Sequence, residues 1–428
     1  MIDTAKDNKR IVERAILIGF HDFASGQEEA SEHLSELNEL MRTLGIPVIK
    51  ELNVCLRAPS PRFLLGSGKA EEIANLATEL KADCIVFDHD LSPSQQRNWE
   101  KLTKLCVIDR QEVILDIFAT RATTRESVIQ VELARLQYSL PRLTRAWTHF
   151  SRQVGGKFGV KGAGEQQIEV DRRIIKTKIS QLQKELKEVK QQRSTQRKMR
   201  EKGDITHAAI VGYTNAGKSC LLNAMTGSNV LVENKLFATL DPTTRHLTLP
   251  NRQTILLTDT VGFVRKLPHT LVEAFKSTLE EAVLADFIIH VLDISSKYSE
   301  KHWKTTLSVL EELGAGGKDI ITVFNKTDIV DDAVLKAKLK ARNPDGIFIS
   351  AKTGLGIDTL LSAITLKTKD KTEIVKMRVP PSRHDIVSLA YKNGKVLSSS
   401  YQEDGVLDLE VNIPKSYRRN FEEFIIEQ

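Results

Sequence analysis

The sequence predicts an α/β protein. We expect an N-terminal α/β domain with a long antiparallel helical hairpin, a central α/β domain and a small C-terminal α+β domain. Three observations support this prediction. Short apolar runs alternate with helical patterns in two separate stretches. Between these stretches, apolar residues at heptad spacing lie on both sides of a glycine-rich loop. The end of the chain carries three strand-like runs and a helical pattern near residues 416–428. The expected domain boundaries are 1–122, 123–203, 204–368 and 369–428.

The composition indicates a soluble globular protein. The chain has 428 residues, of which 41% are hydrophobic and 28% charged. Its net charge of +6 is too small to identify a partner by itself. The four cysteines form no CxxC pair, which fits reduced thiols in the cytosol. No apolar run reaches the length of a membrane span, and the first twenty residues are too polar for a signal peptide. We therefore expect a cytoplasmic protein without a membrane span.

The first α/β stretch ends near residue 122. The runs 14–20, 84–90 and 104–110 have the pattern of buried strands, and helical patterns cover 69–83 and 92–102. Alternation of this kind favours a largely parallel sheet with helices on its faces.

Two heptad-patterned segments then predict the hairpin. Thr123 and Glu126 have the spacing of a capping box, and Pro141 is expected to interrupt the first helix. The apolar seam continues after the loop 153–165, so the two helices should pack antiparallel. With roughly 28 residues per helix, the arm would extend about 40 Å and carry the glycine loop at its tip.

The central α/β stretch opens with a phosphate-binding motif. An apolar strand leads into GYTNAGKS, and a helix follows. Glycines let backbone N–H groups surround phosphate oxygens, the lysine neutralises the β and γ charges, and the serine hydroxyl binds Mg²⁺. The nucleotide-binding residues predicted here are Gly212, Tyr213, Thr214, Asn215, Ala216, Gly217, Lys218, Ser219 and Cys220.

Three further motifs complete a guanine-nucleotide site. A strand ends in DTVG, where Asp259 is expected to hold Mg²⁺ and Gly262 to contact the γ-phosphate. In NKTD, Asp328 can accept hydrogen bonds from guanine N1–H and the N2 amino group, neither of which adenine offers. The remaining base-site residues are Asn325, Lys326, Ser350, Ala351 and Lys352, with the Ala351 N–H expected to donate to guanine O6.

The ordered set resembles the translation-factor-related class of P-loop GTPases, so the central domain is expected to be a GTPase domain. Residues 236–245, LFATLDPTTR, resemble switch I of the Obg-HflX superfamily. The resemblance implies that Phe237, Ala238 and Thr239 adjoin the nucleotide and that Thr239 joins Ser219 and Asp259 on Mg²⁺. Thr243 and Thr244 remain alternatives to Thr239.

The expected catalytic group comprises Lys218, Thr239, Gly262 and Phe263. Small signalling GTPases place a glutamine directly after D-x-x-G to orient the attacking water, and Phe263 cannot bond water. We therefore expect slow intrinsic hydrolysis that a partner stimulates. In related GTPases an asparagine at the position of Asn215 helps bind K⁺. The alternative, that Asn215 only shapes the turn, remains open.

The hairpin predicts an RNA contact. Lysines and a phenylalanine lie among the tip glycines, which permit close approach to a phosphate–sugar surface, and basic residues outnumber acidic ones on the second helix. A merely solvated charged face is the alternative. The expected rRNA contacts are Gly155, Gly156, Lys157, Phe158, Lys161, Gly162, Arg172 and Arg173.

Segments along nearly the whole chain resemble the HflX family. They include 63–73, 86–100, 107–122, 142–153, 161–173, 236–245 and 259–282. The resemblance implies a ribosome-associated GTPase that binds the large subunit and its rRNA and helps split stalled or stressed ribosomes, with the arm directed at the peptidyl-transferase region. The tip departs from the family's usual GGxGxRGPGE: it is one residue longer, with Lys161 for arginine and Ala163 for proline.

Other functions remain open at this point. The chain could act in ribosome assembly or hibernation, regulate a protein partner through the coiled coil, or be an RNA-dependent ATPase with a relaxed base pocket. We expect GTP and GDP as ligands, Mg²⁺ as cofactor and a monomeric chain.

Overall fold

The computed structural model describes residues 12–21, 26–56, 58–143, 164–201, 205–228, 236–265, 281–368, 372–402 and 405–426. Contacts divide the chain into two compact units, the first mainly Met1–Glu188 and the second mainly Val189–Asn234, Ala238–Lys266 and Phe275–Gln428. Each unit is described by itself below. Among the described helices, none is both long enough and apolar enough to cross a membrane.

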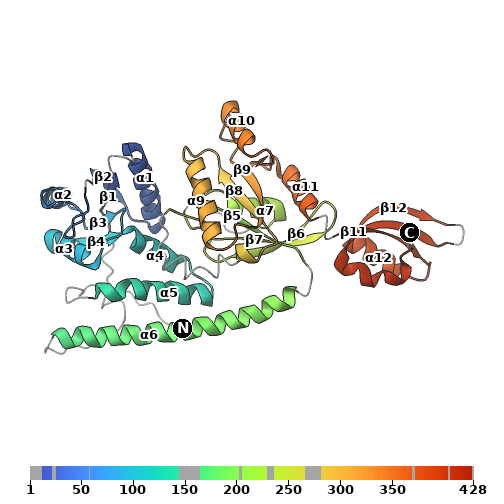
Figure 1. Ribbon diagram of the computed structural model, residues 1–428, viewed down its shortest axis with the longest axis horizontal. Coiled ribbons are helices and arrows are strands. Elements are labelled where there is room, and N and C mark those ends of the chain that lie inside the picture. Colours follow the sequence, from blue (N-terminus) through green and yellow to red (C-terminus); the bar gives the residue numbers. More distant parts are fainter. Residues whose placement is uncertain are drawn as a thin grey trace. The chain divides into compact units, whose positions relative to one another are not determined.

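The first unit contains a four-stranded parallel sheet in the order β2-β1-β3-β4. Figure 1 shows α1 and α4 on one side of this sheet and α2 and α3 on the other. The sequence prediction found neither β2 nor α4. The elements are β1 (Ala15–His21), α1 (Gly26–Leu44), β2 (Val48–Cys55), α2 (Ser67–Glu79), β3 (Cys84–Phe87), α3 (Pro93–Thr103), β4 (Cys106–Asp109) and α4 (Arg110–Arg121).

The hairpin is present in part. Helix α5 (Arg125–Ser139) runs into a 3-10 turn, η1 (Leu140–Arg142), so the expected interruption at Pro141 is confirmed. The predicted capping box is wrong by one residue, because the side chain of Thr124, not Thr123, accepts the Ser127 N–H. Helix α6 (Gly164–Glu201) has 38 residues.

Ion pairs join α5 to α6, which lie side by side in Figure 1. Arg125 Nη2 is 2.6 Å from Glu185 Oε1, and Lys178 pairs with Glu132. Leu182, which lies on α6 within the predicted apolar seam, is buried. The tip loop lies outside the described residues.

The second unit begins with a six-stranded sheet in the order β10-β9-β8-β5-β7-β6. All its pairings are parallel except that of β6 with β7. The elements are β5 (His207–Gly212), α7 (Lys218–Thr226), β6 (Thr243–Thr248), β7 (Thr254–Asp259), β8 (Phe287–Asp293), α9 (Ser299–Glu312), β9 (Asp319–Asn325), α10 (Ala333–Arg342), β10 (Ile347–Phe348) and α11 (Ile357–Lys367).

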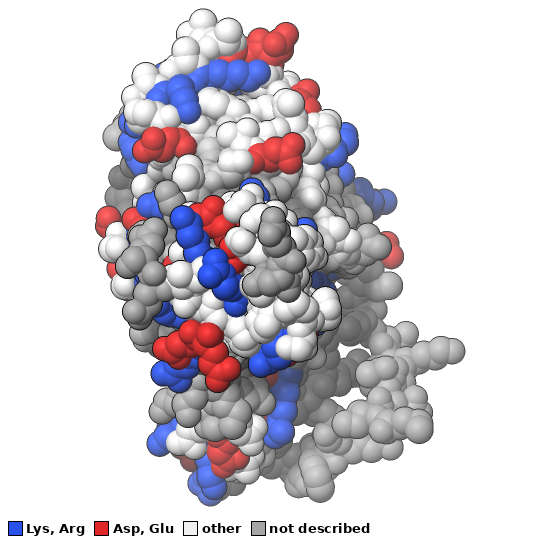
Figure 2. All heavy atoms as spheres, turned by 90° about the vertical axis from the view of Figure 1, so that its right-hand side faces the viewer, with Lys and Arg blue, Asp and Glu red and all other residues white. Residues whose placement is uncertain are grey.

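The C-terminal part is a three-stranded antiparallel sheet, in the order β11-β13-β12, packed on α12. Its elements are β11 (Thr372–Val379), α12 (His384–Asn393), β12 (Lys395–Tyr401), β13 (Leu407–Pro414), η3 (Lys415–Asn420) and η4 (Glu422–Phe424). The sequence prediction missed α12. Figure 2 shows basic and acidic side chains interspersed on the face it presents.

The helix expected over the last residues of the chain is wrong. Two 3-10 turns occupy this region instead. Phe421 is fully buried against the sheet, and Ile425 forms a bridge with Met377 of β11. A continuous helix would prevent both contacts, so the tertiary packing overrides the helical pattern.

Candidate nucleotide-binding site

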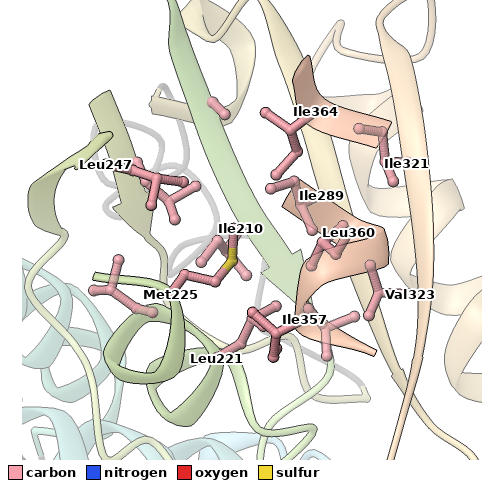
Figure 3. Close-up of a cluster of buried hydrophobic side chains, with 14 of the residues drawn as sticks. Ile210, Leu221, Met225, Leu247, Ile289, Ile321, Val323, Ile357, Leu360 and Ile364 are labelled. Carbon is pink, nitrogen blue, oxygen red and sulfur yellow. The ribbon is translucent and has the colours of Figure 1, made fainter. Parts of the chain in front are cut away.

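The predicted phosphate loop lies at the carboxyl end of β5, the strand between β7 and β8. Apolar side chains of β5, α7, β8 and α11 form the core that fixes this edge, among them Ile210, Leu221, Ile289 and Leu360 (Figure 3). In open α/β sheets, ligands bind at the carboxyl ends of the strands. The fold therefore places the motif where a nucleotide can be bound.

The loop geometry requires glycine at two positions. At Gly217 φ is 95°, and a Cβ atom would lie 2.3 Å from the side-chain nitrogen of Asn325. At Gly212 a Cβ would lie 2.3 Å from the carbonyl oxygen of Val291. Asn215 adopts a left-handed conformation with φ of 61°. Helix α7 begins at Lys218, so its free N–H groups and dipole favour an anion at the loop.

Lys218 is almost completely buried, and its Nζ donates a hydrogen bond of 3.0 Å to the carbonyl of Tyr213. Burial lowers the pKa of this lysine to about 8, while Asp259 acts in the opposite direction. A bound phosphate would restore the ammonium form by supplying negative charge. Lys218 is thus positioned to bind an anion, and binding of a phosphate would raise its pKa.

The three predicted Mg²⁺ ligands converge. The Ser219 hydroxyl donates to Asp259 Oδ2 at 2.6 Å and lies 2.8 Å from the Thr239 hydroxyl. Burial raises the pKa of the Asp259 carboxyl, while Lys218 and Ser219 lower it, and its other oxygen, Oδ1, is buried without a hydrogen-bond partner in the described structure.

This donor set fits Mg²⁺. The ion prefers oxygen ligands and typically takes one or two carboxylates together with substrate phosphates. Within the described residues no cluster of three or more His, Cys, Asp or Glu side chains could hold a metal alone. Of the alternatives to Thr239, Thr244 is engaged with Thr258 at 2.9 Å, and Thr243 begins β6. Phe237 and Ala238 directly precede Thr239, with Phe237 buried.

The segment after Asp259 lies against the phosphate loop. A Cβ on Gly262 would lie 2.8 Å from Thr214 Cα and 2.9 Å from Lys218 Nζ. Phe263 is fully buried and forms a parallel β-bridge with Tyr213. Its side chain therefore packs inside the domain, while its place in the expected catalytic group stays a prediction.

Asn325 joins the phosphate loop to the base site. Its side-chain nitrogen donates to the Ala216 carbonyl at 2.8 Å, and its oxygen accepts the Ala351 N–H at 3.0 Å. Sequence reasoning predicted Asn325 as a nucleotide contact and the Ala351 N–H as a donor to guanine O6. Here that N–H is bonded to Asn325, so Asn325 connects two loops. The Cys220 thiol donates to the Ala351 carbonyl at 3.4 Å.

The remaining base-site residues lie at the ends of β8, β9 and β10. The Ser350 hydroxyl donates to Asp328 Oδ1 at 2.7 Å and lowers the pKa of that carboxyl, leaving Oδ2 for a base. Lys326 pairs with Asp293 at 2.7 Å, and Lys352 follows Ala351. Sequence reasoning missed Asp293, although it also ends an apolar strand, which was the available signal.

The predicted rRNA contacts are only partly described. Arg172 and Arg173 are exposed on α6. The residues predicted at the tip, from Gly155 to Gly162, lie outside the described residues.

Comparisons with known proteins cover the chain from end to end. Family models match as GTP-binding GTPase N-terminal (31–119), GTP-binding GTPase Middle Region (121–200), 50S ribosome-binding GTPase (207–326) and HflX C-terminal domain (334–424). GTPase HflX of Akkermansia muciniphila is 48% identical over 99% of both chains, and that of Escherichia coli 39% identical over 94% of both. A GTP-binding protein from Sulfolobus solfataricus, solved with GDP, is 26% identical over 84% of this chain and 99% of its own, with a TM-score of 0.44.

Proposed function

The chain belongs to the HflX family of GTPases, and from this premise we propose that it binds the large ribosomal subunit in its GTP state and promotes the dissociation of stalled ribosomes. Binding of guanine nucleotide and hydrolysis of GTP are the shared activity of the family and of its GTP-binding domain. The proposal adds a partner and an outcome to that activity.

In the proposed nucleotide site, Gly212–Ser219 surrounds the phosphates and Lys218 neutralises their charge. Asp328, Lys326 and the loop 350–352 surround the guanine base. Ser219, Thr239 and Asp259 hold Mg²⁺, which stabilises the charge that develops on the transferred phosphoryl group.

Because Phe263 offers no polar atom and is buried, the chain itself places no side-chain amide beside the attacking water at this position. Positioning in trans can raise the rate of hydrolysis by roughly 10³–10⁵. We therefore propose that the ribosome supplies this contribution and that GTP hydrolysis ends the bound state.

The observation that carries the ribosomal part is the exposed basic surface of α6. Five basic side chains, Arg172, Arg173, Lys176, Lys184 and Lys187, are exposed on its described part. The exposed acidic side chains there are Glu169, Asp171 and Glu188. A basic helix that leads to a glycine-rich loop suits a phosphate backbone, where each neutralised phosphate strengthens binding and makes it salt-dependent.

Sedimentation with purified large subunits tests this proposal. The intact chain should co-migrate with the subunit in the presence of a non-hydrolysable GTP analogue and much less with GDP. Reversing charge on α6 with Arg172→Glu and Arg173→Glu should weaken binding, whereas Lys338→Glu with Arg419→Glu, two exposed basic residues of the second unit, should not. Absence of co-migration in both nucleotide states would refute the proposal.

A second experiment separates binding from splitting. Subunit dissociation from intact ribosomes is measured by light scattering with the parent chain and with a deletion of residues 155–164. We expect the deletion to lose splitting while it retains hydrolysis of GTP in isolation. Equal splitting by both would show that the tip loop is not required.

A further inference from the structure

The segment that follows Asp259 is hydrogen-bonded to β5 and to the start of the phosphate loop. The Thr260 hydroxyl donates to the Ile210 carbonyl at 2.7 Å. The Phe263 N–H donates to the Gly212 carbonyl at 3.1 Å, and the Thr214 N–H donates back to the Phe263 carbonyl at 2.7 Å. The loop that would surround the phosphates and the glycine that would sense the γ-phosphate are therefore parts of one hydrogen-bonded unit.

Tyr213 connects this hydrogen-bonded unit to Arg265 and to His302. Its hydroxyl accepts the Arg265 N–H at 2.9 Å, and its ring stacks on His302 of α9 with centroids 3.9 Å apart and an interplanar angle of 10°. Its carbonyl also accepts the Lys218 ammonium. The ring is buried, so it is held by the protein and is not a surface contact.

We propose that Tyr213 is a positioning residue for GTP hydrolysis. Its hydroxyl fixes the backbone directly after D-x-x-G, and His302 fixes the ring that carries this hydroxyl. Phosphoryl transfer depends almost entirely on positioning and electrostatics, so a small displacement of a donor carries a large kinetic cost.

The close packing of Gly262 gives the reason that this position is sensitive. Its backbone lies so near Thr214 and Lys218 that no Cβ would fit. The direction of its N–H is set by the bonds on either side, at Thr260 and at Phe263 to Arg265. Since the Phe263 side chain cannot orient water, hydrolysis depends on the position of the backbone around Gly262. Tyr213 holds the end of this segment at Arg265 through its hydroxyl.

The first test is Tyr213→Phe in the full chain, with hydrolysis measured without ribosomes. This change keeps the ring and the stack but leaves the Arg265 N–H without its acceptor. We expect kcat to fall roughly tenfold, equivalent to about 1.4 kcal/mol, with KM and the Kd for GDP changed less than about twofold. Tyr401→Phe, at an exposed tyrosine, is the matched control and should leave kcat unchanged. An unchanged kcat in Tyr213→Phe would overturn the proposal.

The second test addresses His302. We expect His302→Ala to lower kcat several-fold and His302→Phe, which retains a flat ring, to restore it. Amide exchange at Arg265 should accelerate in Tyr213→Phe and His302→Ala while the Phe263 amide is unaffected. If these variants lower only the melting temperature and keep parental kcat and Arg265 exchange, Tyr213 has a structural role alone. Because no ribosome is present, the result does not depend on the ribosomal partner.

Discussion

Replacing Asn325 with alanine should weaken nucleotide binding, because its side chain joins two loops of the predicted site. Asn325 ends β9 and is 2% exposed. Its amide bonds the Ala216 carbonyl of the phosphate loop and the Ala351 N–H of the base site. Alanine removes both bonds and leaves these two backbone groups buried and unpaired.

The magnitude follows from these two groups. Each unpaired buried group costs about 1–3 kcal/mol, so the sum is about 2–6 kcal/mol. Part of this cost lowers the stability of the domain, since both bonds join protein groups. We expect about 2–4 kcal/mol to appear in binding, which is roughly 30- to 1,000-fold in the Kd for GDP.

Titration with a fluorescent GDP analogue measures this effect, and thermal unfolding measures the part lost from stability. Asn343→Ala is the matched control, because Asn343 lies at the end of α10 and is not one of the predicted nucleotide-binding residues. Asn325→Asp should bind at least as weakly as Asn325→Ala, since its carboxylate would face the Ala216 carbonyl. If Asn325→Ala binds GDP within about threefold of the parent, the two loops are not coupled through this side chain.

Four further predictions concern three single residues, Lys218, Phe263 and Asp328. Because burial lowers the pKa of Lys218 to about 8 and phosphate binds the ammonium form, the Kd for GDP should rise up to roughly tenfold per pH unit above about pH 8, and a flat profile between pH 7 and 9.5 would contradict this. The same lowered pKa means that the unfolded chain binds more protons between about pH 8 and 10.5, so the unfolding free energy of the nucleotide-free chain should rise across that window. Phe263→Gln should lower stability by about 2–4 kcal/mol in chemical denaturation without accelerating hydrolysis, whereas a faster rate would show that the side chain reaches the water. Asp328→Asn should exchange GTP for xanthosine triphosphate as the preferred substrate in competition assays, and an undiminished preference for GTP would argue against the base contact.

Motifs with a fixed local geometry could be predicted from the sequence. The approach of Ser219 to Asp259 follows from the strand–loop–helix context and the order of the motifs, whereas Thr239 was implied only by the resemblance of residues 236–245 to switch I of the Obg-HflX superfamily. The burial of Phe263 did not follow, because a phenylalanine after D-x-x-G gives no signal for the β-bridge to Tyr213. The bridge between loops at Asn325 is likewise a product of tertiary packing across more than a hundred residues.

In the fold, too, elements with a local signal could be predicted, and elements set by tertiary packing could not. Pro141 interrupts its helix as expected because its effect is local. Helix α12 had a usable signal, since Ile386 and Ala390 are four residues apart on its buried side and Gly394 follows its end. The prediction of a helix over the last residues was wrong, because Phe421 and Ile425 gain contacts with the sheet that no local sequence rule predicts.

The strand order of the second unit has a consequence for the synthesis of the chain. Strand β5 is apolar and lies inside the sheet, yet its two neighbours come later, with Ala208 pairing with Leu257 of β7 and with Phe287 of β8. The second pairing spans about 80 residues, so at roughly 5–20 residues per second β5 waits about 4–16 s for it. During that interval the apolar side chains and the unpaired backbone groups of β5 are exposed to non-native pairing and to chaperones. We expect this domain to become protease-resistant only after β8 leaves the exit tunnel, and nascent chains stalled before and after that point would reveal the transition.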